Sequence, residues 1–277
     1  MMDLCSFGAG VQSSAIALLA HNRDSRLLEV TGGEVPARYL FADTGDEPPE
    51  VYEQLERFES MVPIDRVYRY EDRRSLADQL CGRLESGAQT GVTWIPGFVE
   101  AGATSAPIQR RCTHAMKVEA LDRASRRIAK VPRGCKVPMV RTWLGISLDE
   151  ISRCKTSREP WRRFFYPLIE MGWRRGRCIQ YLREHGFSIA RSACVYCPFR
   201  SNREWQRMRT EEPHNFASAV AFEQRLHKAY DALEEPALRS KPYLHRTRDP
   251  IDQVDFTGGQ IEMWSAMEQE CSGVCGV

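Results

Sequence analysis

Two strand–loop–helix patterns follow one another near the start of this 277-residue chain. The first joins an apolar strand predicted over residues 3–6, through a Gly- and Ser-rich loop, to a helix over 13–22. The second joins a strand over 38–42, through Asp-Thr-Gly, to a helix over 49–61. Two βα units this close together predict an α/β fold with a doubly wound parallel sheet. Both loops would then lie at the carboxyl edge of the sheet, where ligands bind in such folds.

The first loop, Ser-Phe-Gly-Ala-Gly-Val-Gln-Ser-Ser at residues 6–14, has the composition of a phosphate-binding loop. Small residues let the backbone curl round an anion, which the N–H groups and the positive end of the helix dipole then face. The loop lacks the Gly-Lys-Ser/Thr ending of a P-loop. On these residues alone, a glycine-rich turn that binds nothing is the alternative.

Later segments extend the pattern. Phe-Ala-Asp-Thr-Gly ends at residue 45, Arg-Arg-Cys-Thr with a following lysine spans 110–117, and Gly-Ile…Asp-Glu…Arg spans 145–153. Cys-Val-Tyr-Cys-Pro lies at 194–198, and Glu-Cys-Ser-Gly-Val-Cys-Gly at 270–276. In content and order, these motifs and the first loop resemble the PP-loop ATP pyrophosphatases of the PAPS reductase-like superfamily. The likeness covers nearly the whole chain and is nearest the DNA phosphorothioation and sulfonucleotide reductase branches.

Two positions depart from that family's pattern. Gln12 stands where the family's loop has an aspartate. No histidine follows Cys271, whereas the reductases carry one after the cysteine of their C-terminal motif.

The resemblance implies a Rossmann-like, PP-loop nucleotide-binding domain over residues 1–169. A mostly helical, Arg-rich and Cys-containing subdomain would follow over 170–277. Helical patterns at 176–185, 202–209 and 215–234 agree with the second assignment.

The resemblance also implies that ATP binds over the sheet, with its phosphates in the first loop and its adenosine against the Asp-Thr-Gly turn. The predicted nucleotide-binding residues are Ser6, Phe7, Gly8, Gly10, Gln12, Ser13, Ser14, Asp43, Thr44, Gly45 and Arg158. Mg²⁺ and basic side chains would offset charge during attack at the α-phosphorus. The predicted catalytic residues are Lys117, Glu150, Arg153 and Cys271. Alternatively, Lys117 and Arg153 lie on a helix surface, and Glu150 pairs with Arg153.

Cysteines form two closely spaced pairs, Cys194 with Cys197 and Cys271 with Cys275. Two such pairs could make a tetrahedral zinc site. Alternatively, Cys112, Cys194, Cys197 and Cys275 could hold a [4Fe–4S] cluster, which the resemblance favours. The third interpretation is that these thiols are free or carry a persulfide.

The function predicted from the resemblance is an ATP pyrophosphatase that adenylylates an acceptor and supports sulfur transfer to nucleic acid. Its partner would be a sulfur donor such as a cysteine desulfurase. One alternative is a PAPS or APS reductase that uses Cys271 or Cys275. Another is an adenine-nucleotide-binding subunit without chemistry. The oligomeric state, a homo-oligomer included, is left open.

Charge is unevenly distributed along the chain. Residues 153–209 hold thirteen arginines and one lysine against four acidic residues, interleaved with aromatic side chains. Arginine binds phosphate and stacks on bases, so this segment predicts a nucleic-acid surface. The alternative is an arginine-rich composition in general, because the whole chain holds 33 arginines and 6 lysines.

The Gly-, Thr- and Pro-rich segment 86–109 is longer than an ordinary loop, which predicts either an active-site lid or a surface insertion. No apolar run approaches the roughly 18 residues of a membrane helix, and no basic residue precedes Arg23. We therefore expect a cytoplasmic protein without a membrane partner.

Overall fold

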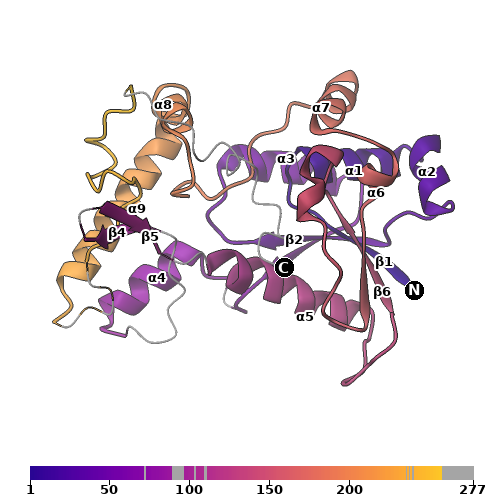
Figure 1. The fold of residues 1–277 in the computed structure, drawn as a ribbon, viewed down its shortest axis with the longest axis horizontal. Helices are drawn as coiled ribbons and strands as arrows, with labels where there is room; N and C mark the ends of the chain where they lie inside the picture. Colours follow the sequence, from indigo (N-terminus) through magenta and orange to yellow (C-terminus); the bar gives the residue numbers. More distant parts are fainter. Residues whose placement is uncertain are drawn as a thin grey trace.

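The computed structural model describes residues 1–71, 73–88, 97–102, 104–108, 111–234, 236, 238 and 240–257. Its centre is a five-stranded sheet in the order β3-β2-β1-β6-β7, all of whose neighbouring strands run parallel (Figure 1). The strands are β1 (Met2–Ser6), β2 (Arg38–Asp43), β3 (Ile64–Tyr68), β6 (Val140–Leu144) and β7 (Arg162–Phe165). The strand order reverses between β1 and β6, which is where ligands bind in doubly wound sheets. The predicted α/β class is confirmed.

Helices cover both faces of the sheet. The helices on one face are α1 (Val11–His21), α2 (Ser25–Thr31), α3 (Pro49–Glu59), α6 (Pro167–Glu170) and α7 (Arg175–Glu184). The π-helical turn η1 (Thr113–Val118) and α5 (Glu119–Ile128) cover the other face. Because side chains alternate along a strand, Leu4 enters the core beneath α5, whereas Cys5 enters the core beneath α1.

α1 lies deep in the sheet lobe, where α7 packs against it. Every residue from 11 to 20 is buried, which accounts for the Ala- and Leu-rich composition of this helix. The apolar face of α7 contributes Cys178, Tyr181 and Leu182 to the same core.

A second lobe, beside the sheet lobe in Figure 1, has a core of its own. Its elements are α4 (Leu76–Glu85), β4 (Phe98–Ala101), β5 (Thr104–Pro107), α8 (Asn202–Glu211) and α9 (Pro213–Asp231). Leu80 and Leu84 of α4 share a core with Trp205 of α8 and Phe222 of α9. This lobe therefore combines a piece of the first half of the chain with the C-terminal helices.

The division of the chain between these two cores does not coincide with the predicted boundary at residue 169. α4 and the β4–β5 hairpin come before it but lie in the second lobe, while α7 comes after it and packs on α1. Within the segment predicted as a lid or insertion, β4 and β5 pair in antiparallel fashion, and Phe98 of β4 also pairs with Tyr243. Residues 89–96 lie outside the described part. No helix in the described part is long and apolar enough to cross a membrane.

Candidate functional site

The first loop turns sharply between β1 and α1. Ala9 has a left-handed backbone conformation, with a φ of 53°, which costs a non-glycine residue roughly 1–2 kcal/mol. The Ser13 hydroxyl accepts a hydrogen bond from the Gly8 N–H at 3.2 Å and donates one to the Gly10 carbonyl at 3.1 Å. The first turn of α1 then follows, whose N–H groups no helical carbonyl can satisfy. Ser13 thus fixes the shape of the loop from within.

The side chain of Phe7 points into the core and not toward the inside of the first loop. The ring packs in the core, with its centroid 5.5 Å from that of Phe58 and 6.4 Å from that of Tyr39. The predicted nucleotide contact at Phe7 is therefore restricted to its backbone.

Gly145, directly after β6, approaches the first loop closely. A Cβ atom at this position would lie 2.8 Å from the Ser13 backbone nitrogen, so only glycine fits without movement. This approach brings the following 3-10 helix η2 (Leu148–Arg153) against the loop. Two of the predicted catalytic residues, Glu150 and Arg153, lie on that short helix.

Gln12 connects the loop to these residues. Its side-chain Nε2 donates to Glu150 Oε2 at 2.8 Å, and Arg153 Nη1 donates to Glu150 Oε1 at 2.5 Å. The side-chain oxygen of Gln12, Oε1, accepts a hydrogen bond from Arg175 Nη1 at 2.8 Å. The structure thus brings three predicted residues together and adds Arg175, which the sequence analysis did not single out among its arginine neighbours.

The second loop, residues 43–47 between β2 and α3, is held by its own side chains. Asp43 Oδ1 accepts hydrogen bonds from the Gly45 N–H and the Tyr52 hydroxyl, both at 2.8 Å. Burial and the neighbouring Asp43 carboxylate raise the pKa of Tyr52, so its hydroxyl stays protonated as the donor. Gly45 has a φ of 76°, and a Cβ there would lie 2.8 Å from Ser75. The Asp-Thr-Gly turn therefore has one well-defined shape.

A buried ion pair lies at the end of this loop. Lys117 Nζ is 2.9 Å from Glu47 Oε1, with side-chain exposures of 7% and 0%. The other Glu47 oxygen accepts from the Ser192 hydroxyl at 3.2 Å. Lys117 lies in the π-helical turn η1, a geometry that is frequent at functional sites. The alternative of a helix surface is therefore wrong for Lys117.

The Cys-x-x-Cys segment runs along the second loop. Cys194 Sγ lies 3.4 Å from Thr44 Oγ1, and the Val195 N–H donates to the Asp46 carbonyl at 3.0 Å. The Tyr196 hydroxyl donates to the Asp46 carboxylate. No local sequence pattern indicates this proximity, because about 150 residues separate the two segments.

Burial controls protonation in this segment. It raises the pKa of the Cys194 thiol well above the usual value, and the carboxylates of Glu47 and Asp46 add to the effect, while Lys117 opposes it. Burial also raises the pKa of Asp46 to about 6, although the hydrogen bonds from Tyr196 and the Ala77 N–H lower it. Without a bound cation or substrate, Cys194 is therefore a neutral thiol.

Cys112, Cys194 and Cys197 do not form a ready metal site. Among the described residues, no group of three or more His, Cys, Asp or Glu side chains could hold a metal ion. Cys112 and Cys194 pack against the core of the second lobe, and the Cys194 carbonyl accepts from the buried Arg200 at 3.1 Å. Cys271 and Cys275 lie outside the described residues, so the cluster and zinc hypotheses stay predictions.

The Glu150 carboxylate beside the first loop is already engaged within the protein. Both oxygens of Glu150 already accept hydrogen bonds, one from Gln12 and one from Arg153. Mg²⁺ prefers carboxylate and water oxygens, and Gln12 supplies an amide in a position where a carboxylate would suit the metal. Arg158 is exposed, in the turn before β7.

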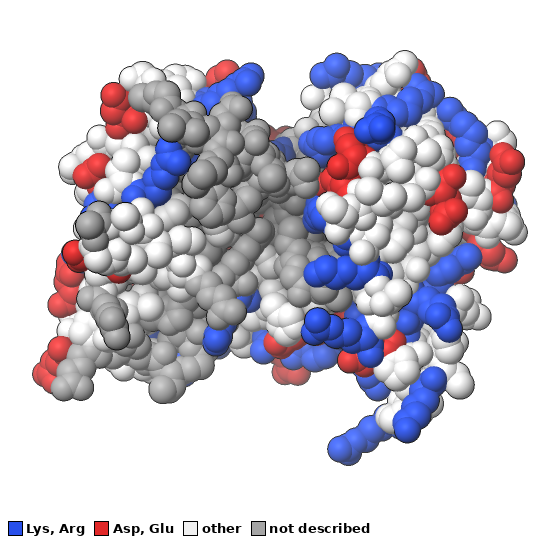
Figure 2. All heavy atoms as spheres, viewed as in Figure 1, with Lys and Arg blue, Asp and Glu red and all other residues white. Residues whose placement is uncertain are grey.

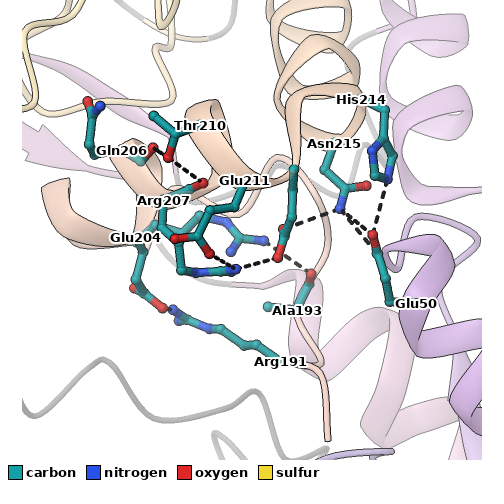
Figure 3. Close-up of polar contacts among 12 residues, drawn as sticks. Glu50, Arg191, Ala193, Glu204, Gln206, Arg207, Thr210, Glu211, His214 and Asn215 are labelled. Carbon is teal, nitrogen blue, oxygen red and sulfur yellow. Dashed lines mark hydrogen bonds and ion pairs between the residues drawn. The ribbon is translucent and has the colours of Figure 1, made fainter. Parts of the chain in front are cut away.

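The arginine-rich segment is largely used inside the protein. Figure 3 shows Arg191 paired with Glu204, and Arg207 paired with Glu211 and Glu212. In the same view, Asn215 of α9 donates to Glu50 of α3. The contact between Asn215 and Glu50 fastens the second lobe to the sheet lobe, whereas the pairs of Arg207 lie within α8 and its C-terminal end.

Most of the larger aromatic side chains of this segment are buried. Trp161, Trp173, Tyr196 and Trp205 are each at most 6% exposed, so these rings belong to the protein core and not to a surface for nucleic acid, whereas Phe164 and Phe165 are half-buried. Figure 2 shows Lys and Arg side chains over the half of this face that carries α2 and α7, but mixed with Asp and Glu.

Comparison of the chain with models of known protein families and with curated proteins gave no match. The function must therefore be argued from the site.

Proposed function

We propose that this protein is an ATP pyrophosphatase that adenylylates an acceptor and supports the transfer of sulfur to it. The observation that carries the proposal is the position of Cys194. Its sulfur lies 3.4 Å from Thr44 in the turn at the end of β2, next to the buried Lys117–Glu47 pair. A thiol at the nucleotide-binding edge of a doubly wound sheet suits chemistry that joins a nucleotide and sulfur.

The first loop supports the nucleotide part of the proposal. It lies at the end of β1, beside the reversal of strand order, and leads directly into the N-terminus of α1. Helix N-termini with small residues before them bind phosphate groups. The strained Ala9 and the Gly145 contact hold this loop in one shape, as a preorganised binding site requires.

The proposed reaction has two stages, adenylylation and sulfur transfer. An oxygen of the acceptor forms a bond to the α-phosphorus of ATP, the bond from that phosphorus to the bridging oxygen breaks, and pyrophosphate leaves with the electron pair. A donor such as a cysteine desulfurase then passes its persulfide sulfur to the Cys194 thiol and keeps its own thiol. The outer sulfur of the Cys194 persulfide bonds to the activated atom of the acceptor, and AMP leaves with the electron pair. A thiol reductant cleaves the resulting S–S bond and frees the thiolated acceptor. Mg²⁺ bound with ATP would offset phosphate charge.

Two cations of the chain suit the first step. Arg153 reaches the first loop through Glu150, and Lys117 reaches the second loop through Glu47. A positively charged side chain therefore lies beside each loop. Glu150 holds Arg153 in place, and Glu47 holds Lys117. Such fixed charges favour a reaction in which negative charge moves onto a leaving pyrophosphate.

We propose nucleic acid as the acceptor. Lys155 is exposed two residues after Arg153, and its backbone N–H donates to the hydroxyl of Tyr166, directly after β7, at 2.9 Å. Arg158 and Arg163 are exposed too, but they lie toward the start of β7, away from the two loops. Recognition through these cations would depend on phosphate contacts and would weaken strongly with salt.

The test uses anaerobically purified protein with ATP, Mg²⁺, a cysteine desulfurase with cysteine as the persulfide donor, a thiol reductant and candidate nucleic acids. We expect pyrophosphate and AMP to form in step with sulfur incorporation. Cys194→Ser should abolish sulfur incorporation, while Cys135→Ser, at a half-buried cysteine that donates to the Val137 carbonyl, should not. Sulfite release from PAPS or APS with thioredoxin, without pyrophosphate, would instead support a reductase. ATP binding without either product would support a nucleotide-binding subunit.

A further inference from the structure

The outer face of α5 carries a row of cations. Arg123 and Arg127 are four residues apart, so they lie on one side of the helix, and both are exposed. The opposite side of α5 is buried against the sheet through Ala120 and Ala124. Lys130, which is exposed too, comes two residues after the end of the helix. The row therefore faces away from the core along α5.

The loop of residues 131–138, which follows this row, adds two more cations. The Cys135 N–H donates to the Pro132 carbonyl at 3.2 Å, which closes a turn around Arg133. The side chain of Cys135 packs against the core beneath α5, so this turn is fixed to the sheet lobe. Arg133 and Lys136 are both exposed. The loop therefore presents its cations from a defined backbone.

These cations keep their charge toward the solvent. The chain has no Asp or Glu from residue 123 to residue 148. Arg123 donates to a neutral acceptor, the Arg69 carbonyl, at 2.7 Å. Over the part of the chain that the structure describes, the other four cations of the row and the loop take part in no ion pair. We call the five cations together the α5 track: Arg123, Arg127, Lys130, Arg133 and Lys136.

The α5 track begins on the side of the sheet that carries the two loops. α5 directly follows η1, which holds Lys117 beside the second loop. The Arg69 carbonyl that Arg123 contacts comes directly after β3, at the same edge. The helix then runs toward the opposite edge, where Arg126 pairs with Glu159, ahead of β7. α5 lies along the lower side of the sheet lobe in Figure 1. The track therefore leads from the proposed nucleotide site to the far edge of the sheet.

We propose that the α5 track binds the phosphate backbone of the acceptor nucleic acid and holds it while one nucleotide reaches the two loops. This inference rests on the proposed function, because it takes nucleic acid as the acceptor. A row of charges of one sign is complementary to a chain of phosphates, and guanidinium groups bind phosphate with paired hydrogen bonds. Such contacts position a nucleic acid without reading its sequence.

An anionic membrane is the other surface that a row of cations could bind. A surface that lies in the lipid headgroup layer also needs an apolar face beside its cations. Across residues 119–138, all of which the structure describes, Val137 is the one exposed large apolar side chain. The α5 track therefore suits nucleic acid better than lipid.

The test measures binding of a DNA duplex of about 20 base pairs and of a single-stranded RNA of similar length, by fluorescence anisotropy between about 50 and 200 mM salt. One combined variant carries Arg127→Gln, Lys130→Gln and Arg133→Gln, which removes three phosphate contacts. We expect its affinity to fall at least about tenfold. The slope of log affinity against log salt should become shallower by about 3 for the duplex, or about 2 for the single strand.

The matched control makes the same change of charge elsewhere. It combines Arg23→Gln, Arg183→Gln and Lys228→Gln, at exposed residues outside the α5 track. Its affinity for nucleic acid should stay within about twofold of wild type, because salt screens distant exposed charges. Thermal unfolding checks that both variants are folded. Their ATP affinity, measured by calorimetry, should equal that of wild type, since the changed residues do not contact the two loops.

Three outcomes would overturn the inference. If wild type binds the nucleic acids and both combined variants bind them equally well, the acceptor is held at another surface and the proposed function stands. If wild type binds neither probe at about 50 mM salt, the inference and the nucleic-acid acceptor both fail, while pyrophosphate release from ATP still tests the nucleotide chemistry. If the first variant loses binding to phosphatidylserine vesicles but keeps binding to nucleic acid, the track is a membrane surface.

Discussion

The two loops at the carboxyl edge of the sheet are held in different ways. The first loop, after β1, is held by its own Ser13, by the close approach of Gly145 and by side chains from η2 and α7 of the same lobe. The second loop, after β2, is held by Lys117 and by the segment 192–197, which leads into the second lobe. The contacts described for the first loop therefore all lie within the sheet lobe. Those of the second loop connect the sheet lobe to the cysteine segment.

This difference indicates how the proposed reaction is divided. Binding of phosphate depends on a rigid loop, whereas transfer of sulfur depends on bringing a thiol from a distant part of the chain to the nucleotide. Because Glu47 contacts both Lys117 and Ser192, one buried carboxylate connects the cation and the cysteine segment. Changes in the two loops should therefore have separable effects.

The largest effect is expected at the buried pair of the second loop. Lys117→Met leaves the Glu47 carboxylate buried without its cation, which should lower the free energy of unfolding by about 3–5 kcal/mol. The matched control is Lys241→Met, whose partner Asp231 is 56% exposed; this loss should stay under about 1 kcal/mol. Urea unfolding at neutral pH measures both. Equal losses would show that Lys117 and Glu47 are not a buried pair in solution.

A smaller effect is expected at the first loop. Gly145→Ala places a Cβ 2.8 Å from the Ser13 nitrogen, and such overpacking should cost about 1–3 kcal/mol. ATP affinity should fall with it, because the loop must move. At Gly176, in α7, a Cβ meets nothing within 4 Å, so Gly176→Ala should be neutral or slightly stabilising. If Gly145→Ala binds ATP as tightly as wild type, ATP binding does not depend on the shape of the first loop.

Protonation of Asp46 should change the free energy of unfolding by about 2–3 kcal/mol, an effect confined to a narrow pH range. The folded-state pKa of about 6 lies above the ordinary value of 3.8, so folding favours the protonated carboxyl. Its contribution to stability is therefore full below about pH 4 and is lost as the pH rises through 6.

The measurement compares wild type with Asp46→Asn by urea unfolding between pH 4 and 7. The asparagine variant cannot lose a proton at this position. The free energy of unfolding of wild type should therefore fall relative to that of the variant as the pH rises. Parallel curves would mean that Asp46 is not buried against Tyr196 as described.

Much of the fold followed from local pattern. The apolar strands and glycine turns at 3–6 and 38–42 predicted β1 and β2 well, and the helices beside them. β7 was missed because its sequence, Arg-Arg-Phe-Phe, has no strand-like alternation of polar and apolar residues. The burial of Trp161, Trp173 and Trp205 could not be predicted, because interleaved arginine and tryptophan give the same pattern whether the rings lie in a core or on a surface.

The site could be predicted only in part, because its decisive contacts are long-range. The first loop and Lys117 were found from motifs, but the Lys117–Glu47 pair spans 70 residues and the Gln12–Arg175 contact spans 163. Arg175 was not distinguishable from Arg174 and Arg177 beside it. Such pairings depend on tertiary packing, which no local pattern encodes.

The central claim is that the nucleotide and Cys194 share one site, and alkylation of Cys194 tests it most directly. Its raised pKa makes the thiol slow to react, so the rate is measured above pH 9 by mass spectrometry, with Cys135 as the internal control. If ATP closes the site, ATP at about ten times its dissociation constant should slow alkylation of Cys194 about tenfold and leave Cys135 unchanged. An unchanged Cys194 rate, at an ATP concentration that calorimetry shows to be saturating, would contradict the account.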